Sequence, residues 1–434
     1  MVVQALAGVP RALPRPLIGG AAGTVGGAMI GTNWAGNHVY RAARLHRPAS
    51  LDELREIVAA APRIRVLGSR HSFNAIADSD ELVSLAGLPA DVVVEQGSVS
   101  FGAGLTYGDL AKALEPHGVA LANFASLPHI SVAGAVATAT HGSGDANGNL
   151  ATAVAGLELM TSNGETVTAT RGDADFDGFV VNLGALGAVT RITLDVEPAY
   201  EIRQHVFEGL PWPALFEHFD EITAAGYSVS VFTRWGDDVD QVWIKARETE
   251  PVRDELFGAR AATVDRHPIL GFDTANVTPQ LGRPGPWWDR LAHFRMGFTP
   301  SAGDELQSEY FVARAHAIGA IEALRGLSDR MRPLIQVAEI RTTAADRLWL
   351  SPQYEQDTVQ FHFTWRVEPE AVLDVLRHVE AALAPFAARP HWGKLFIARP
   401  RYEKLPDFIR LVERLDPRGA FRNRWLDSHV LGRG

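Results

Sequence analysis

A short turn rich in glycine and serine carries the first residues that could do chemistry. It spans residues 68–74, follows a short apolar strand predicted over 64–67, and places His71 at its centre. Small residues leave backbone N–H groups free to bind an anionic phosphate, and the imidazole of His71 can act as a nucleophile. A Gly-Ser turn after a strand is usually only a turn, so this stretch alone leaves both interpretations open.

A second candidate is the stretch over residues 125–144, in which nearly all side chains are small or hydroxylic. Small side chains let the backbone approach a flat ligand closely. Such a stretch could also be a tightly packed core segment. The density of its hydroxyl groups favours the wall of a polar ligand site, and these groups belong to Ser126, Ser131, Thr138, Thr140 and Ser143.

Three predicted strands, over residues 306–310, 338–342 and 359–367, carry polar side chains at alternate positions. These side chains are Gln307, Glu309, Glu339, Arg341, Gln360, His362, Thr364 and Arg366. Each strand by itself could belong to a sheet with one solvated face. The mixture of Glu, Arg, His and Gln on all three strands favours a pocket for a polyol.

Hairpins and short helices must position these residues. Ser50 begins a capping box and an amphipathic helix to about residue 60, directly ahead of the strand before His71. The Asn163-Gly164 pair predicts a type I′ turn between strands over 157–161 and 165–170. Further strands are expected over 92–95, 98–101 and 188–196, and further helices over 107–116 and 368–384. The pattern indicates an α+β fold.

Length and composition set broad limits. The 434 residues suffice for two domains, or for one domain with a long insertion, and 46% of them are hydrophobic. A net charge of −10 argues against nucleic acid or an anionic membrane as the main partner. The lack of cysteine excludes disulfides, thiolate catalysis and Cys-ligated metal sites, and we expect no metal site.

Common catalytic motifs are missing from the sequence. The glycines at 102, 104 and 108 resemble a dinucleotide fingerprint, but the third comes one residue late and no acidic residue follows at the expected distance. The phosphate-loop, His-Glu-x-x-His and Gly-x-Ser-x-Gly patterns are absent as well. Rossmann, NTPase and common hydrolase functions therefore lose their usual support.

The first 32 residues have an unusual composition. Arg11 and Arg15 precede an apolar run over residues 17–30 that is too short to span a bilayer. The run could be part of a secretory signal, but no clear cleavage site follows it. We expect a poorly ordered leader over residues 1–32 and a cytoplasmic protein.

Several motifs in the same order resemble the vanillyl-alcohol-oxidase family of flavoproteins. They are GSRHSFN at 68–74, the small-residue stretch at 126–144, LGALG at 183–187 and DPRGAFRN at 416–423. Within that family, four further motifs are similar to those of the alditol (sugar alcohol) oxidases. They are ASLPHI at 125–130, EIRT at 339–342, HFTW at 362–365 and HWGK at 391–394. The resemblance covers about residues 33–425.

The resemblance implies a two-domain FAD-binding fold with an inserted cap domain, which is built on an antiparallel sheet with helices. The expected parts are an FAD-binding domain over residues 33–197, the cap over 198–397, and a return to the FAD-binding domain over 398–434. FAD is the implied cofactor, with His71 bonded to its 8α-methyl group. The other implied cofactor residues are Val66, Leu67, Gly68, Ser69, Arg70, Ser72, Ser126, Ser131, Gly134, Thr138, Ala139, Thr140, His141, Val189 and His391. Arg70 departs from the glycine of some alditol oxidases, and could reach a phosphate or alter the turn.

The resemblance also implies a reaction: oxidation of a terminal CH–OH of an acyclic polyol such as xylitol or sorbitol to an aldose, with O2 reduced to hydrogen peroxide. Arg341 and Lys394 are suited to hold the reacting oxygen, and His362 is the candidate base. The remaining hydroxyls would be bound by Ser126, Gln307, Glu339, Arg341 and Thr364. Two alternatives stay open: a sugar-lactone oxidoreductase of the same family, and a flavin- or carbohydrate-binding protein without catalysis. We expect a monomer.

Overall fold

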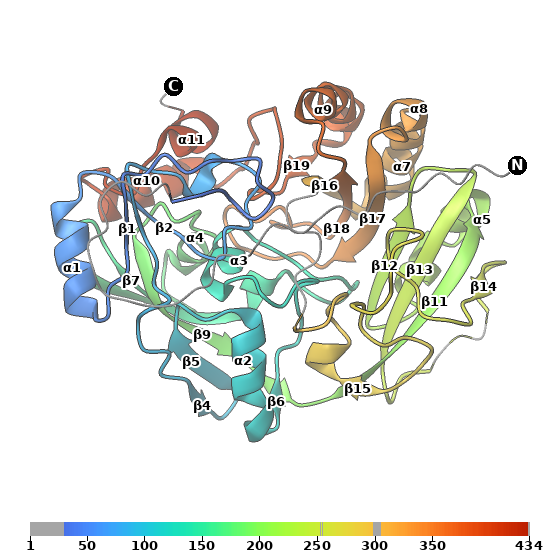
Figure 1. Cartoon of the computed structure of the whole chain (residues 1–434), viewed down its shortest axis with the longest axis horizontal. Coiled ribbons are helices and arrows are strands. Elements are labelled where there is room, and N and C mark those ends of the chain that lie inside the picture. The colour runs from blue at the N-terminus through green and yellow to red at the C-terminus, as the bar shows by residue number, and fades with distance from the viewer. Residues whose placement is uncertain (1–29, 252, 254, 298–304, 433–434) are drawn as a thin grey trace, which may run out of the picture.

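The computed structural model describes residues 30–251, 253, 255–297 and 305–432, so most of the predicted leader lies outside the described residues. Two lobes lie side by side (Figure 1), and each has its own sheets and hydrophobic core. We call them the first lobe and the cap lobe. The predicted α+β architecture is confirmed.

The first lobe contains a small parallel sheet and a larger antiparallel one. The parallel sheet has the order β1 (Arg44–His46), β3 (Glu81–Val83), β2 (Ile64–Val66). The antiparallel sheet has the order β4 (Val93–Glu95), β5 (Ser98–Gly102), β9 (Ala188–Asp195), β7 (Val154–Met160), β8 (Thr166–Thr170). A two-stranded sheet pairs β6 (Val119–Ala120) with β10 (Glu197–Pro198). The helices are α1 (Leu51–Ala60), α2 (Tyr107–Leu114), α3 (Val132–Ala137), α4 (Phe176–Val180), α10 (Leu405–Leu415) and α11 (Arg424–Leu426).

The start of α1 follows its sequence signal. The Ser50 hydroxyl accepts a hydrogen bond from the backbone N–H of Glu53 at 3.2 Å, as an N-cap should. Leu54 and Val58 are fully buried on the inner face of this helix. The predicted helix over residues 50–60 is therefore confirmed.

The hairpin between β7 and β8 forms as predicted, but the prediction of a type I′ turn is wrong. That turn needs a positive φ at both central residues, whereas Gly164 (φ 79°) has one and Asn163 does not. The Gly164 N–H donates to the Thr161 carbonyl at 2.9 Å, and the Thr161 N–H donates to Glu165 at 2.8 Å. The chain thus makes a longer turn that ends on a left-handed glycine, a common alternative in hairpins.

The cap lobe is built on one antiparallel sheet of nine strands. Its order is β14 (Arg260–Ala261), β11 (Glu201–Pro211), β13 (Asp238–Arg247), β12 (Ser228–Thr233), β17 (Ile335–Thr343), β18 (Thr358–Trp365), β16 (Leu306–Ala313), β19 (Arg389–Pro390), and β15 (Gly285–Pro286) pairs with β11. Its helices are α5 (Trp212–Glu217), α6 (Phe219–Thr223), α7 (Ala317–Arg325), α8 (Ser328–Met331) and α9 (Pro369–Leu383). Figure 1 shows α7, α8 and α9 together on one face of β16–β18.

Alternation along β16, β17 and β18 separates two buried faces. Phe361, Phe363 and Trp365 of β18 pack in the same core cluster as Val372 and Leu376 of α9. The polar residues between them point to the other face, toward the first lobe. The sheet register pairs Glu309 with His362 and His362 with Glu339, so three ionisable side chains form one row across the strands. The predicted polar face exists, and it is buried rather than solvated.

The C-terminal segment returns to the first lobe. Phe408, Leu411 and Phe421 join the first-lobe core, and the Ile64 N–H donates to Ala420 at 2.7 Å. Trp287 and Leu350, which lie within the predicted cap range, join the same core. The exact boundaries at 198 and 398 remain predictions.

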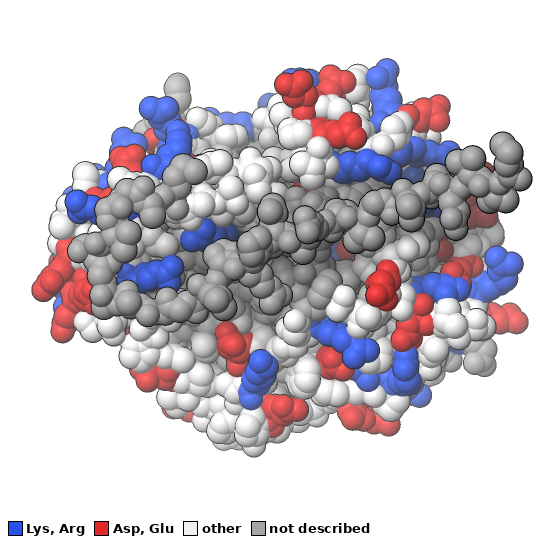
Figure 2. Space-filling model, in the orientation of Figure 1, with Lys and Arg blue, Asp and Glu red and all other residues white. Residues whose placement is uncertain are grey.

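Two surface features can be stated for the described part of the chain. Acidic and basic side chains are interspersed over both lobes on the face drawn in Figure 2. None of the described helices has the length and apolar character needed to cross a membrane.

Candidate active site

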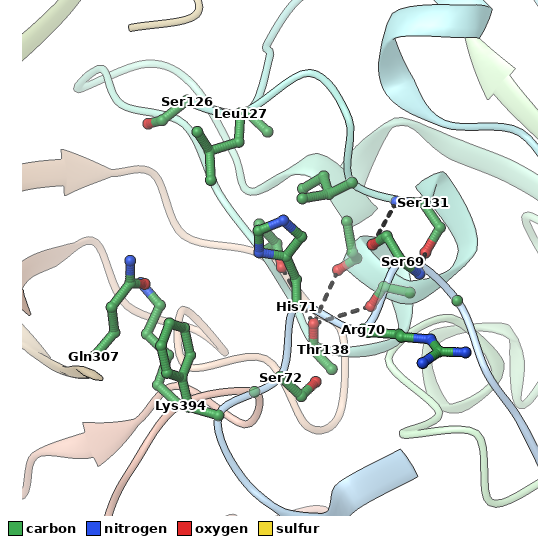
Figure 3. A pocket seen from close by; sticks show the side chains of 18 of the residues that line it. Ser69, Arg70, His71, Ser72, Ser126, Leu127, Ser131, Thr138, Gln307 and Lys394 are labelled. Atoms are coloured by element: carbon green, nitrogen blue, oxygen red, sulfur yellow. Dashed lines mark hydrogen bonds between the residues drawn. The ribbon is translucent and has the colours of Figure 1, made fainter. Parts of the chain in front are cut away.

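A cavity of about 740 Å³ lies between the lobes. Its first-lobe wall comes from the turn at His71 and the stretch over 125–141, and its cap wall comes from β16, β17 and β18. Figure 3 shows Gln307 and Lys394 across the cavity from Ser69 and Ser131, with the His71 ring between them. The volume is within the usual range for small-molecule and cofactor sites.

The turn at His71 interlocks with the start of α3. The Ser131 backbone N–H donates to the Ser69 hydroxyl at 3.0 Å. A Cβ at Gly68 would lie 2.4 Å from the Ser131 hydroxyl oxygen, so glycine is needed for this close approach. The two segments singled out in the sequence therefore form one continuous wall.

Arg70 occupies a left-handed conformation (φ 63°), which favours glycine. Its guanidinium donates to the Ile30 carbonyl at 2.8 Å and lies over the Tyr40 ring at 5.6 Å. Of the two possibilities for this residue, the structure supports a role in the turn and the segment before it. No phosphate is needed to explain where the guanidinium lies.

His71 is enclosed by two aromatic side chains. Its ring stacks on Trp34 with centroids 4.7 Å apart, and its Nε2 lies 2.6 Å from Nε2 of His129. Burial, together with His129 and Lys394, lowers the pKa of His71 to about 3. The imidazole is therefore neutral near pH 7, with a lone pair available on one nitrogen.

Glu309 is the centre of the charged network on the cap wall. Its side chain is fully buried, and its carboxylate contacts Lys394 Nζ at 2.7 Å, His141 Nε2 at 3.0 Å and Arg341 Nη2 at 3.4 Å. Burial alone would raise the pKa of Glu309, but Lys394 and His141 hold it well below its ordinary value. The Glu309 carboxylate is therefore ionised, and it holds the cationic side chains of Lys394 and Arg341 in place.

Lys394 and His362 form a close pair beside this carboxylate. Lys394 Nζ lies 2.6 Å from His362 Nδ1, and His362 Nε2 lies 3.1 Å from the Thr364 hydroxyl. Burial and Lys394 lower the pKa of His362 to about 4, while burial lowers the pKa of Lys394 against the opposing effect of Glu309. Only one proton can lie between the two nitrogens, so the pair can take up or release a proton at a fixed place.

Arg341 connects the cap wall to the first lobe. Its Nη1 donates to the Ser126 hydroxyl at 3.4 Å, and its Nε lies 3.4 Å from Glu339 Oε1 without a hydrogen bond. Glu339 in turn accepts a hydrogen bond from His293 Nε2 at 2.9 Å. These groups offer a donor and an acceptor side by side, as a vicinal diol requires.

All but one of the residues predicted for the site line this cavity. The cap members are Gln307, Glu339, Arg341, His362, Thr364, His391 and Lys394, and the others are Val66, Leu67, Gly68, Ser69, Arg70, His71, Ser72, Ser126, Ser131, Gly134, Thr138, Thr140, His141 and Val189. The exception is Ala139, which is fully buried in the first-lobe core with φ 51°. Its side chain supports the wall from behind.

Sequence reasoning missed three polar residues around the site and left a fourth without a role. Glu309 was named with Gln307 on one polar strand face, but no function was assigned to it. His129 lies within the ASLPHI motif and was not singled out there. His293 and Lys245 come from a loop and from β13, and no local pattern points to either of them.

The first-lobe wall fits FAD. It combines close backbone approach at Gly68 with neutral, hydroxyl-bearing side chains at Ser69, Ser131 and Thr138, which suits a flat ring system and a pyrophosphate. The cap wall then faces the ring with its cationic groups. Two chemically different walls around one cavity suit a cofactor on one side and a polar substrate on the other.

Comparison with known proteins agrees with this geometry. Residues 42–170 match the FAD binding domain family, and residues 304–429 match the D-arabinono-1,4-lactone oxidase family. An alditol oxidase of Streptomyces sp. (strain IKD472 / FERM P-14339) is 49% identical over 407 residues, which cover 91% of this chain and 97% of that protein. The chain belongs to the alditol oxidase family.

Other relatives are more distant. The L-gulono-1,4-lactone dehydrogenase of Mycobacterium tuberculosis is 28% identical, with coverage of 93% of this chain and 99% of that protein. The crystal structure of cholesterol oxidase from B. sterolicum has a TM-score of 0.74 at 15% identity, with coverage of 92% of this chain and 96% of that chain. That likeness concerns the fold alone. Together with the FAD binding domain match, it confirms the predicted FAD-binding fold of the vanillyl-alcohol-oxidase type. This member of the alditol oxidase family is an FAD-dependent oxidoreductase.

Proposed function

We propose that the chain oxidises the terminal CH–OH of an acyclic polyol, such as xylitol or sorbitol, to an aldose, with O2 as the electron acceptor. The observation that carries this proposal is the row of Glu309, His362 and Glu339 across one buried sheet face. These groups, with Arg341 and Lys394, provide paired donors and acceptors for a chain of hydroxyls. An apolar substrate would leave them desolvated without partners.

FAD, when bound on the first-lobe wall, supplies the hydride acceptor. The protein has to hold the alcohol and accept its proton. Lys394 Nζ and Arg341 Nη2 lie 2.7 and 3.4 Å from the Glu309 carboxylate, and both groups can stabilise negative charge that develops on the reacting oxygen.

His362 remains our candidate for the proton acceptor, acting together with Lys394. Its lowered pKa keeps the imidazole neutral near pH 7, which a base requires. Because Nδ1 lies 2.6 Å from Lys394 Nζ, the protonation of His362 is coupled to that of Lys394. Ser126, Gln307, Glu339 and Thr364, which line the same cavity, would bind the remaining hydroxyls.

We also propose that His71 is bonded covalently to the 8α-methyl group of FAD. Its ring lines the cavity, is neutral and is held by contacts with Trp34 and His129. Protein precipitated with acid should then keep its yellow colour, whereas His71→Ala protein should release it. Release of all colour by the unmodified protein would contradict the covalent bond.

Anaerobic flavin reduction by a panel of polyols and aldonolactones, followed by exposure to air, tests the proposed reaction. Rapid reduction by polyols and peroxide formation in air would support it. Reduction by lactones alone would favour the activity named for the more distant relatives, and no reduction by either class would favour a binding protein. The monomeric state and the cytoplasmic location stay predictions.

A further inference from the structure

Lys245 carries a buried amino group that the proposed reaction does not use, and burial lowers the pKa of this group to about 7 against the opposing effect of Glu339. It lies on β13, is 1% exposed, and does not line the cavity. Its Nζ contacts the Leu291 carbonyl at 2.5 Å, the Ala292 carbonyl at 3.2 Å and His293 Nδ1 at 3.0 Å. Three acceptors match the three N–H bonds of an ammonium group.

The His293 ring connects Lys245 to Glu339 on the cavity wall. Because Nδ1 accepts from Lys245, the proton of the neutral ring lies on Nε2, which donates to Glu339 Oε1 at 2.9 Å. Burial and Lys245 lower the pKa of His293 to about 4, so the ring is neutral near pH 7. The backbone N–H of His293 also donates to the Ser126 carbonyl at 3.2 Å, which fixes the ring against the first lobe.

Glu339 is the end of this chain of contacts. Its Oε1 receives the His293 hydrogen bond and lies 3.4 Å from Arg341 Nε, while the side chain lines the cavity. Without a donor at His293, the carboxylate would lose the bond that fixes its orientation. Loss of Lys245 would allow His293 to adopt the other tautomer, with no proton on Nε2.

We propose that Lys245 and His293 are positioning residues that fix the orientation of Glu339 and thereby set the affinity for the polyol. The proposal rests on the role of Glu339 in binding the substrate. Lys245 acts from behind the cavity wall, so its removal should weaken binding without slowing hydride transfer from the bound polyol. A merely structural role would not produce this separation.

Anaerobic stopped-flow reduction of the flavin by xylitol or sorbitol tests the proposal, because it gives the polyol dissociation constant and the limiting rate separately. Lys245→Met is expected to raise the dissociation constant about tenfold and to leave the limiting rate within about threefold. Glu339→Gln should raise the dissociation constant at least as much. The double variant should be no weaker than Glu339→Gln alone, because both changes remove the same interaction.

Thr278→Val is the matched control. The Thr278 hydroxyl donates to the Ala292 carbonyl at 2.8 Å and approaches the His293 carbonyl at 3.3 Å, so the variant disturbs the same loop without touching the ring. Its dissociation constant should stay within about twofold of the unmodified value. An equal rise in Thr278→Val and Lys245→Met would contradict the proposal, as would additive effects in the double variant.

A pair of His293 variants covers the case in which Lys245→Met does not fold. Glutamine can accept from Lys245 and donate to Glu339, whereas leucine can do neither. His293→Gln should keep most of the affinity and His293→Leu should lose it, and equal affinities would overturn the proposal. Unchanged affinity in Glu339→Gln would refute the substrate role of Glu339 itself, which separates that failure from a failure of the coupling alone.

Discussion

The two walls of the cavity differ in their charge and in the kinds of side chain that form them. Arg70 is the one arginine or lysine in the first-lobe wall over residues 66–72 and 126–141, and most of that wall is made of backbone, hydroxyls, small side chains and neutral histidines. The cap wall places Glu309, Lys394, Arg341, His362 and Glu339 in mutual contact. A cofactor that stays bound needs close shape complementarity, whereas a substrate that must lose a proton and a hydride needs groups that respond to charge.

Buried carboxylates show the same contrast. Glu309 lies among cationic groups, and its pKa is held well below the ordinary value. Asp346, which packs against the first lobe, accepts hydrogen bonds from the neutral Asn149 amide at 2.7 Å and Ser351 hydroxyl at 2.5 Å. Burial raises its pKa to about 6, with Ser351 opposing the rise. Cationic partners, more than burial itself, decide whether a carboxylate in this protein stays charged.

Removal of the cation nearest the proposed reaction should have the largest effect. Lys394→Met should lower the limiting rate of anaerobic flavin reduction about 10²- to 10³-fold, as loss of one charge-stabilising donor does in other enzymes. Lys404→Met is the control, because Lys404 is half-buried outside the cavity and forms an ion pair with Asp407 at 3.5 Å. A Lys394→Met rate within threefold of the unmodified rate would remove Lys394 from the mechanism.

Neutralising the carboxylate that holds this cation should have the next largest effect. Glu309→Gln keeps the shape but leaves Lys394 and Arg341 without their shared partner, so we expect a fall of about 10²-fold in the same rate. Glu380→Gln is the control, because Glu380 accepts from Tyr310 at 2.9 Å on the helical side of the same strand. If both variants reduce the rate equally, the effect is general to β16 and the contrast between the walls is lost.

A methyl group on the first-lobe wall should change cofactor binding instead of rate. In Gly68→Ala the new Cβ would lie 2.4 Å from the Ser131 hydroxyl, so the turn must move and purified protein should hold several-fold less FAD. In Gly156→Ala the nearest atom would be 3.6 Å away, so FAD content should not change. The ratio of flavin to protein absorbance measures both, and full FAD content in Gly68→Ala would show that this wall is not closely fitted.

The smallest effect should come from Asp346, through the pH dependence of stability. Because its pKa is raised from 3.8 to about 6, its contribution to the free energy of unfolding is present below about pH 4 and is lost as pH rises through about 6. Stability measured by urea unfolding should thus improve in Asp346→Asn relative to the unmodified protein between pH 4 and pH 7. The upper limit is about 3 kcal/mol. Parallel pH profiles for the two proteins would contradict the raised pKa.

Local pattern was enough for many elements. Ser50 marks the start of α1, the alternation around His362 marks β18, and proline at 369 marks the start of α9. Local pattern failed to predict the conformation where contacts between residues far apart in the sequence decide it. The Asn163-Gly164 pair signals a type I′ turn, yet residues 161–165 join β7 to β8, and the Gly164 carbonyl accepts a hydrogen bond from the distant Arg55 Nε at 3.1 Å.

The sequence shows that polar residues alternate along β16, β17 and β18, but each strand alone was compatible with a solvent-exposed sheet face. Only the sheet register puts Glu309, His362 and Glu339 in one row, and only the packing of the lobes buries that row. Glu309 is the centre of the charged network because it is buried, since a carboxylate in water would bind Lys394 only weakly.

The sequence by itself determined the family and the α+β architecture, and all but one of the residues that it predicted for the site line the cavity, because those features reside in short motifs and periodic patterns. Tertiary structure alone decided which of these residues touch, which are charged, and that Lys245 stands behind His293 and Glu339. The contacts of Lys245 with His293 and of His293 with Glu339 join residues 48 and 46 positions apart along the chain, and no local signal can encode contacts of that kind.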